Sequence, residues 1–141
     1  MITSVLNNAV TAPTNSSIDC KTEQGIDCPY ICDADMDTIK CRINKVLESI
    51  DEIGLSDIIY ELAECENGFK ETGCGDNGAS CGFLQFQQPT WQAFDCQGSR
   101  YNIEDSVRCG VKLIRKGIGH TTAGWKNCWR IKNLPIIKDG Y

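Results

Sequence analysis

Histidine is almost absent from this chain, whose 141 residues include only His120. A lone histidine among glycines and threonines is a poor candidate for a catalytic base, and we expect it to be a loop residue. Zinc is also disfavoured, because Cys28 and Cys32 have zinc-like spacing but no second close cysteine pair follows them. We therefore predict neither a metal nor a cofactor.

Long apolar runs are missing as well. No stretch is long enough to cross a membrane, and residues 1–19 have neither the basic start nor the apolar centre of an export signal. The net charge of −5 argues against nucleic acid as the main partner. We expect no membrane span and no nucleic-acid partner, while the oligomeric state stays open.

Cysteine, by contrast, is abundant, with ten among 141 residues. An even and high number indicates disulfides formed in an oxidising compartment, so we predict five disulfides whose pairing the sequence leaves open. Such bonds stabilise small proteins outside cells. We expect the protein to be secreted, with its leader removed, or to be carried on a virus particle.

Charge is distributed unevenly along the chain. Residues 1–76 hold 15 acidic and 5 basic side chains, whereas residues 77–141 hold 4 and 9. This asymmetry predicts a basic face that attracts an anionic polymer such as a cell wall, although solvated residues at helix ends explain it equally well. The basic residues concerned are Lys112, Arg115, Lys116, Lys126, Arg130 and Lys132.

The residue pattern predicts a mainly α, α+β domain that is rich in disulfides. We expect residues 1–34 to form an irregular cysteine-bearing segment and residues 35–141 to form the compact domain. Five glycines between Gly68 and Gly82 predict tight turns with at most a short hairpin. Helix signals place the expected helices at residues 39–54, from a cap at Ser56 to 67, from Pro89 to 94, from a cap at Asn102 to 117, and around residues 125–129.

Glu66 is the most informative side chain, because it lies in the last turn of a predicted helix. The partial negative charge at a helix end disfavours a carboxylate, and the nearby apolar residues Leu62, Phe69 and Phe83 would disfavour it further. A carboxyl that keeps its proton near neutral pH can protonate a glycosidic oxygen. We predict that Glu66 is the general acid of a glycosidase, with an ordinary exposed glutamate as the alternative.

Glycosidic cleavage also needs a second carboxylate to stabilise the positively charged sugar ring. Asp76, in the turn Cys74-Gly75-Asp76-Asn77-Gly78, is the leading candidate, and Glu71 and Asp95 are alternatives. The alternative interpretation of Asp76 is a turn residue that bonds its own backbone. Gln85 is polar within an apolar run and is expected to face a partner, whereas Trp91 fits either the core or a sugar platform.

These residues resemble two branches of the lysozyme superfamily over roughly residues 58–116. Invertebrate-type, destabilase-like lysozymes carry Glu-Ser-Gly, Gly-Cys, Ser-Cys-Gly-aromatic-x-Gln and Trp, which match Glu66-Asn67-Gly68, Gly73-Cys74, Ser80 to Gln85, and Trp91. Resuscitation-promoting factors and related transglycosylases carry Leu-Ala-x-Cys-Glu-Ser-Gly, Gly-Leu-Gln-Phe and Thr-Trp, which are similar to Leu62 to Gly68, Phe83 to Phe86, and Thr90-Trp91.

The resemblance implies a lysozyme-like fold and cleavage of the β-1,4 bond between N-acetylmuramic acid and N-acetylglucosamine. It implies that Glu66 is the acid, and it carries Asp76 over only in part, because the loop here is shorter than in the invertebrate-type enzymes. The chain departs from both branches in Asn67, where serine is usual, and in its acidic charge. The cysteine-rich C-terminal part of the invertebrate type is also absent, and the N-terminal segment has no counterpart.

We therefore predict a peptidoglycan-degrading muramidase that uses Glu66 and Asp76 for catalysis. Gln85, Phe86 and Trp91 are the predicted substrate-binding residues. Three alternatives stay open: a lytic transglycosylase forming 1,6-anhydro products, a non-catalytic lysozyme-like binding module or inhibitor, and an isopeptidase. For the last of these, no Ser, Lys or Cys stands out as an activated nucleophile.

Overall fold

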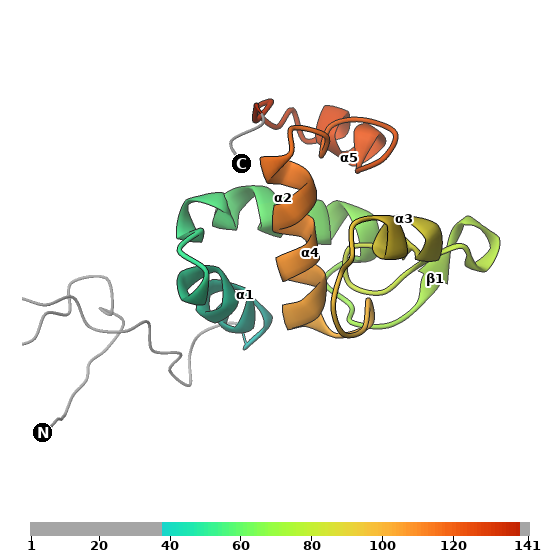
Figure 1. The fold of residues 1–141 in the computed structure, drawn as a ribbon, viewed down its shortest axis with the longest axis horizontal. Helices are drawn as coiled ribbons and strands as arrows, with labels where there is room; N and C mark the ends of the chain where they lie inside the picture. The colour runs from blue at the N-terminus through green and yellow to red at the C-terminus, as the bar shows by residue number, and fades with distance from the viewer. Residues whose placement is uncertain (1–37, 139–141) are drawn as a thin grey trace, which may run out of the picture. The chain divides into compact units, whose positions relative to one another are not determined.

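The computed structural model describes residues 38–138 of the chain (Figure 1). The chain divides into two compact units, Met1–Cys41 and Arg42–Tyr141, and of the first unit only the four residues that begin helix α1 are described. The predicted boundary between residues 34 and 35 therefore lies outside the described residues, as do Cys20, Cys28 and Cys32.

The described part is a mixed α+β structure in which 54% of the residues are helical. This agrees with the predicted mainly helical α+β class. The helices are α1 (Thr38–Ser49), α2 (Ser56–Asn67), α3 (Gln88–Ala93), α4 (Ile103–Arg115) and α5 (Lys126–Ile131), and the 3-10 turns are η2 (Ile53–Leu55) and η3 (Asp76–Gly78).

A small antiparallel sheet of three strands follows α2. Its strands are β1 (Cys74–Gly75), β2 (Ser80–Cys81) and β3 (Phe86–Gln87), in the order β1-β2-β3. Cys74 pairs with Cys81, and Cys81 in turn pairs with Phe86. The prediction of at most a short hairpin missed the third strand, because strands of two residues are too short to show the alternation that marks a strand in sequence.

Helix ends show where local sequence decides the structure. Gly68 adopts the left-handed conformation (φ 60°), and its N–H reaches the carbonyls of Ala63 and Glu64, so the predicted stop of α2 is confirmed. The predicted cap at Asn102 is also confirmed, since its side chain accepts a hydrogen bond from the N–H of Asp105 at 2.8 Å. The predicted cap at Ser56 is wrong, because turn η2 leads directly into α2 and Ser56 is already its first residue.

Helix α4 forms the centre of the core. Its predicted apolar stripe, Ile103, Val107, Val111 and Ile114, is at most 2% exposed. In Figure 1, α1 lies on one side of α4 (orange), α3 and the sheet lie on the other, and α2 crosses behind α4. Gly110 lets the neighbouring chain approach, because a Cβ there would lie 2.9 Å from a methyl carbon of Leu84. The core thus holds the segment before β3 against the middle of α4.

Three disulfides link these elements, and all seven cysteines of the described residues are disulfide-bonded. Cys65–Cys128 joins α2 to α5, Cys74–Cys81 joins β1 to β2, and Cys96–Cys109 joins the chain after α3 to α4. The prediction of disulfide bonding is confirmed at this level. Among residues 38–138, no helix has the length and apolar character needed to cross a membrane.

Candidate active site

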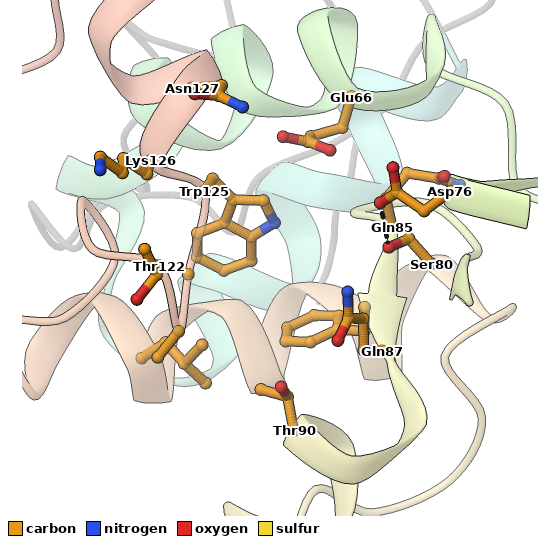
Figure 2. Close-up of a pocket in the computed structure, with 14 residues that line it drawn as sticks. Glu66, Asp76, Ser80, Gln85, Gln87, Thr90, Thr122, Trp125, Lys126 and Asn127 are labelled. Carbon is orange, nitrogen blue, oxygen red and sulfur yellow. Dashed lines mark hydrogen bonds between the residues drawn. The ribbon is translucent and has the colours of Figure 1, made fainter.

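A cavity of about 280 Å³ lies where the end of α2, the small sheet and the chain leading into α5 meet. Figure 2 shows Glu66 at its upper edge, Asp76 and Ser80 on one side, and Thr122 and Lys126 on the other, with Trp125 between them. Residues 66 and 76, predicted from sequence as a catalytic pair, therefore border the same cavity. The remaining lining residues are Gln85, Phe86, Gln87, Thr90, Leu113, Ala123, Gly124 and Asn127.

The carboxyl group of Glu66 is half-buried at the edge of this cavity. Burial, and to a smaller degree the nearby negative charge of Asp76, together raise its pKa from 4.5 to about 7. A carboxyl with this pKa is protonated in about half of the molecules at neutral pH. Glu66 can therefore both donate and recover a proton under physiological conditions.

The apolar residues predicted beside Glu66 lie outside the lining of the cavity. Leu62 and Phe83 are fully buried in the core, and Phe69 packs against Phe83 with ring centroids 6.4 Å apart. None of the three lines the cavity. The apolar lining of the cavity comes from Phe86, Leu113 and Trp125.

Trp125 is the main cavity residue that the sequence analysis did not select. Its ring is 5% exposed, and its indole N–H donates a hydrogen bond to the carbonyl of Leu84 at 2.7 Å. The ring also meets Phe86 edge to face, with centroids 5.4 Å apart. The sequence signal was a tryptophan within a run of polar residues and glycine. Only the tertiary fold brings this residue to the same cavity as Glu66, which lies 59 positions earlier in the chain.

Asp76 lies in turn η3, where the backbone adopts a left-handed conformation (φ 52°). Its carboxylate accepts a hydrogen bond from the hydroxyl of Ser80 at 2.6 Å, drawn as a dashed line in Figure 2. The residue thus lies in a turn, as the alternative interpretation held, but its carboxylate bonds the Ser80 side chain, and it lines the cavity. Ser80 is buried and fixes the direction in which the carboxylate points.

The two alternative carboxylates lie elsewhere. Glu71 pairs with Arg42 at 3.0 Å and accepts the backbone N–H of Ile103 at 3.2 Å. Asp95 accepts a hydrogen bond from Gln97 at 3.2 Å in the chain after α3. Neither residue lines the cavity, so among these three carboxylates only Asp76 is placed to act together with Glu66.

Gln85 lines the cavity, but its amide is engaged in holding the sheet region together. The amide donates hydrogen bonds to the carbonyls of Gly73 at 3.1 Å and Gly82 at 2.9 Å, and it accepts one from the N–H of Gly75 at 3.0 Å. Gly75 directly precedes Asp76. The expected partner of Gln85 is therefore the loop that carries Asp76, which makes Gln85 a positioning residue.

Asn67, which departs from the serine usual in the resembling families, holds the other end of this loop. Its side-chain N–H group points at the carbonyls of Lys70, Thr72 and Gly82, at 3.0–3.1 Å. The amide can serve several carbonyls because it carries two N–H bonds, whereas a serine hydroxyl carries one O–H. The residue after Glu66 thus ties the acid-bearing helix to the sheet.

The two aromatic residues predicted to bind substrate occupy different positions in the structure. Phe86 lines the cavity with a buried ring. Trp91 is 5% exposed and packs edge to face beneath Phe86, with centroids 5.1 Å apart, and it does not line the cavity. Trp91 therefore does not lie where it could bind a sugar in this cavity, because its ring is part of the core and packs against Phe86.

The side of the cavity formed by residues 122–127 was not predicted from sequence. Within the described part of the chain, the side chains of Thr122, Lys126 and Asn127 make no hydrogen bond or ion pair, and all three are exposed. They contrast with Asp76, Ser80 and Gln85 opposite, whose polar groups bind one another or the backbone. Polar groups on one side are thus fixed, and those on the other are available to a ligand.

Over residues 38–138, no group of three or more His, Cys, Asp or Glu side chains is arranged to hold a metal ion. His120 lies in the turn between α4 and α5, near Trp129 with ring centroids 6.4 Å apart, so its predicted place in a loop is confirmed.

Comparisons with protein-family models, with curated proteins and with solved structures found no match to this chain.

Proposed function

We propose that the protein is a muramidase that hydrolyses the β-1,4 bond between N-acetylmuramic acid and N-acetylglucosamine in peptidoglycan. The observation that carries the proposal is the pairing in one open cavity of Glu66, whose pKa is raised to about 7, with the carboxylate of Asp76. The motif resemblance to lysozymes supports the same assignment. No cofactor takes part.

In the proposed reaction, Glu66 donates its proton to the glycosidic oxygen as the bond from that oxygen to the anomeric carbon breaks. The positive charge that develops on the sugar ring is stabilised by the carboxylate of Asp76, which Ser80 keeps oriented through its 2.6 Å hydrogen bond. Water supplies the new hydroxyl group. A proton from that water ultimately restores Glu66, so the enzyme is unchanged after one turnover.

A lytic transglycosylase is the second candidate, because part of the motif resemblance is to that class. Such enzymes use a hydroxyl of the sugar itself as nucleophile and do without an aspartate of this kind. The hydrogen-bonded and cavity-facing Asp76 favours hydrolysis. A non-catalytic binding module is disfavoured by the raised pKa of Glu66, because sugar binding alone requires no proton donor.

We also propose that the protein works outside cells or on a virus particle. The three described disulfides and the bonded Cys41 suit an oxidising compartment. Peptidoglycan as substrate requires access to a bacterial cell wall, which both locations allow.

The proposal is tested by digesting purified peptidoglycan with the wild-type protein and with Glu66→Gln. We expect the release of muropeptides to fall by roughly 10²- to 10⁴-fold in the variant, because the amide cannot donate a proton to the leaving oxygen. Mass spectrometry of the products separates reducing ends, expected here, from the anhydro ends of a transglycosylase.

The matched control is Glu61→Gln on the same helix. Glu61 forms an exposed ion pair with Lys132 at 3.2 Å and lies outside the cavity, so this variant should retain wild-type rates. Near-wild-type release of muropeptides by Glu66→Gln would refute the proposed acid.

A further inference from the structure

Only one of the basic residues in the C-terminal half of the chain borders the cavity. Arg115 is held by Glu52 at 3.0 Å, and Lys132 is held by Glu64 at 2.6 Å. Lys112 donates to the backbone carbonyl of Asp95 at 3.0 Å. These three cations are thus committed to neighbours within the protein and contribute little to attracting a polymer.

Lys126 differs from them in position and in partners. It is the only lysine or arginine among the residues that line the cavity. It forms no ion pair with any described residue, and the adjacent side chains of Thr122 and Asn127 are equally unengaged. In Figure 2 these three lie on the side of the cavity away from Asp76.

The charges around the cavity are therefore polarised. At one side the carboxyl groups of Glu66 and Asp76 disfavour any anionic group, and on the other side the ammonium of Lys126 favours one. An approaching glycan with a carboxylate on one sugar is repelled in one orientation and attracted in the other. Charge then selects both the substrate and the register in which it binds.

We propose that Lys126 makes the cavity selective for glycans that carry a free carboxylate beside the bond to be cleaved, as peptidoglycan strands do where the muramic acid bears no stem peptide. The ammonium pairs with that carboxylate, and Asn127 and Thr122 hydrogen-bond polar groups of the same substituent. This inference rests on the proposed function, since it assumes that a glycan occupies the cavity. Because the pair is exposed, its contribution is modest and depends on salt.

The test measures binding of two matched probes by calorimetry. One is a peptidoglycan strand stripped of its stem peptides, so that each muramic acid bears a free carboxylate. The other is the same strand after conversion of these carboxylates to methylamides. Glu66→Gln serves as the host protein, so that the probe is not degraded during the titration.

We expect the carboxylate strand to bind roughly two- to tenfold more tightly than the amide strand at low salt. Adding Lys126→Gln should abolish this preference, so that the two strands bind about equally. The matched control is Lys116→Gln, which removes the same charge from an exposed position outside the cavity and should keep the preference. High salt should weaken the preference in every protein that shows it.

The outcomes separate this inference from the proposed function. Equal binding of both strands to the host, a preference that survives Lys126→Gln, or no binding of either strand would overturn the role of Lys126. Cleavage of peptidoglycan by the wild-type protein together with equal binding would leave the muramidase proposal standing. Preferential binding that depends on Lys126, without any cleavage, would support the selectivity and refute the enzyme.

Discussion

At the scale of single residues, Glu66 differs from the other glutamates of α2 by its surroundings rather than by its position in the helix. Glu61 and Glu64 lie at the surface, where both pair with Lys132, at 3.2 Å and 2.6 Å. Glu66 has no such cation and is half-buried beside Asp76, which raises its pKa to about 7. One helix thus carries two ordinary carboxylates and one that can act as an acid.

The pH dependence of catalysis follows from this difference. The acid is active in its protonated form, so kcat/KM should fall as the pH rises through about 7.

In Asp76→Asn the negative charge that helps to raise the pKa of Glu66 is removed, so this alkaline limb of the pH profile should move to lower pH. The rate should also fall roughly 10²-fold, because the charge on the sugar ring loses its stabilising partner. An alkaline limb at the same pH in Asp76→Asn as in the wild-type protein would show that Asp76 does not raise the pKa of Glu66.

At the scale of elements, the small sheet orients the carboxylate of Asp76. The strands contain two residues each, so their own ladder contributes little, and the loop is held by the disulfide Cys74–Cys81, by Asn67 and by Gln85. Gln85 itself adopts a left-handed backbone (φ 54°), which its three side-chain hydrogen bonds help to maintain.

Gln85→Ala should therefore loosen the loop that carries Asp76. We expect a loss of about 1–3 kcal/mol in the free energy of unfolding, because three hydrogen bonds from the side chain to the backbone of the loop are lost. We also expect a lower kcat and a shift of the alkaline limb to lower pH, because Asp76 is no longer held beside Glu66. Urea unfolding and the pH profile measure these effects.

Gln92→Ala, an exposed position on α3, is the control and should change neither quantity. Loss of stability in Gln85→Ala with an unchanged pH profile would reduce Gln85 to a purely structural residue.

The sequence predicted the elements whose signals are local. The left-handed stop at Gly68, the cap at Asn102 and the Pro89 start of α3 depend on side chains within a few residues of each boundary, and all three are present. The cap at Ser56 failed because the preceding turn η2 continues into the helix, a feature that no local signal revealed.

At the scale of the whole molecule, the disulfide Cys65–Cys128 connects the acid to the opposite side of the cavity. Its two cysteines directly precede Glu66 and directly follow Asn127 in the chain, although 63 positions separate them. The last turn of α2 and the first turn of α5 are thereby held together. This bond limits the unfolded chain and joins the two helices that carry Glu66 and Asn127.

Removal of each disulfide in turn should show how much that bond contributes to the free energy of unfolding. In the loop-entropy model, the 63-residue span of Cys65–Cys128 contributes about 4 kcal/mol and the 7-residue span of Cys74–Cys81 about 2 kcal/mol. We expect Cys65→Ser/Cys128→Ser to lose more stability in equilibrium urea unfolding than Cys74→Ser/Cys81→Ser. The reverse order would show that loop length does not govern the stability of this fold.

Long-range features account for what the sequence did not reveal. Glu66 and Asp76 are close in the chain and were predicted together, whereas Trp125, Lys126 and Asn127 reach the cavity only through the packing of α5 on α2. The pairing of the cysteines likewise depends on tertiary structure. Burial decided between the two aromatic candidates, since Phe86 faces the cavity and Trp91 lies behind it.

The central claim is that Glu66 keeps its proton near neutral pH while facing the cavity. A carbon-13 NMR titration of the glutamate carboxyl carbons tests it most directly, with the Glu66 signal identified by its absence in Glu66→Gln. The account predicts that this signal titrates with a midpoint near pH 7. A midpoint near 4.5, the ordinary value for a glutamate, would contradict it.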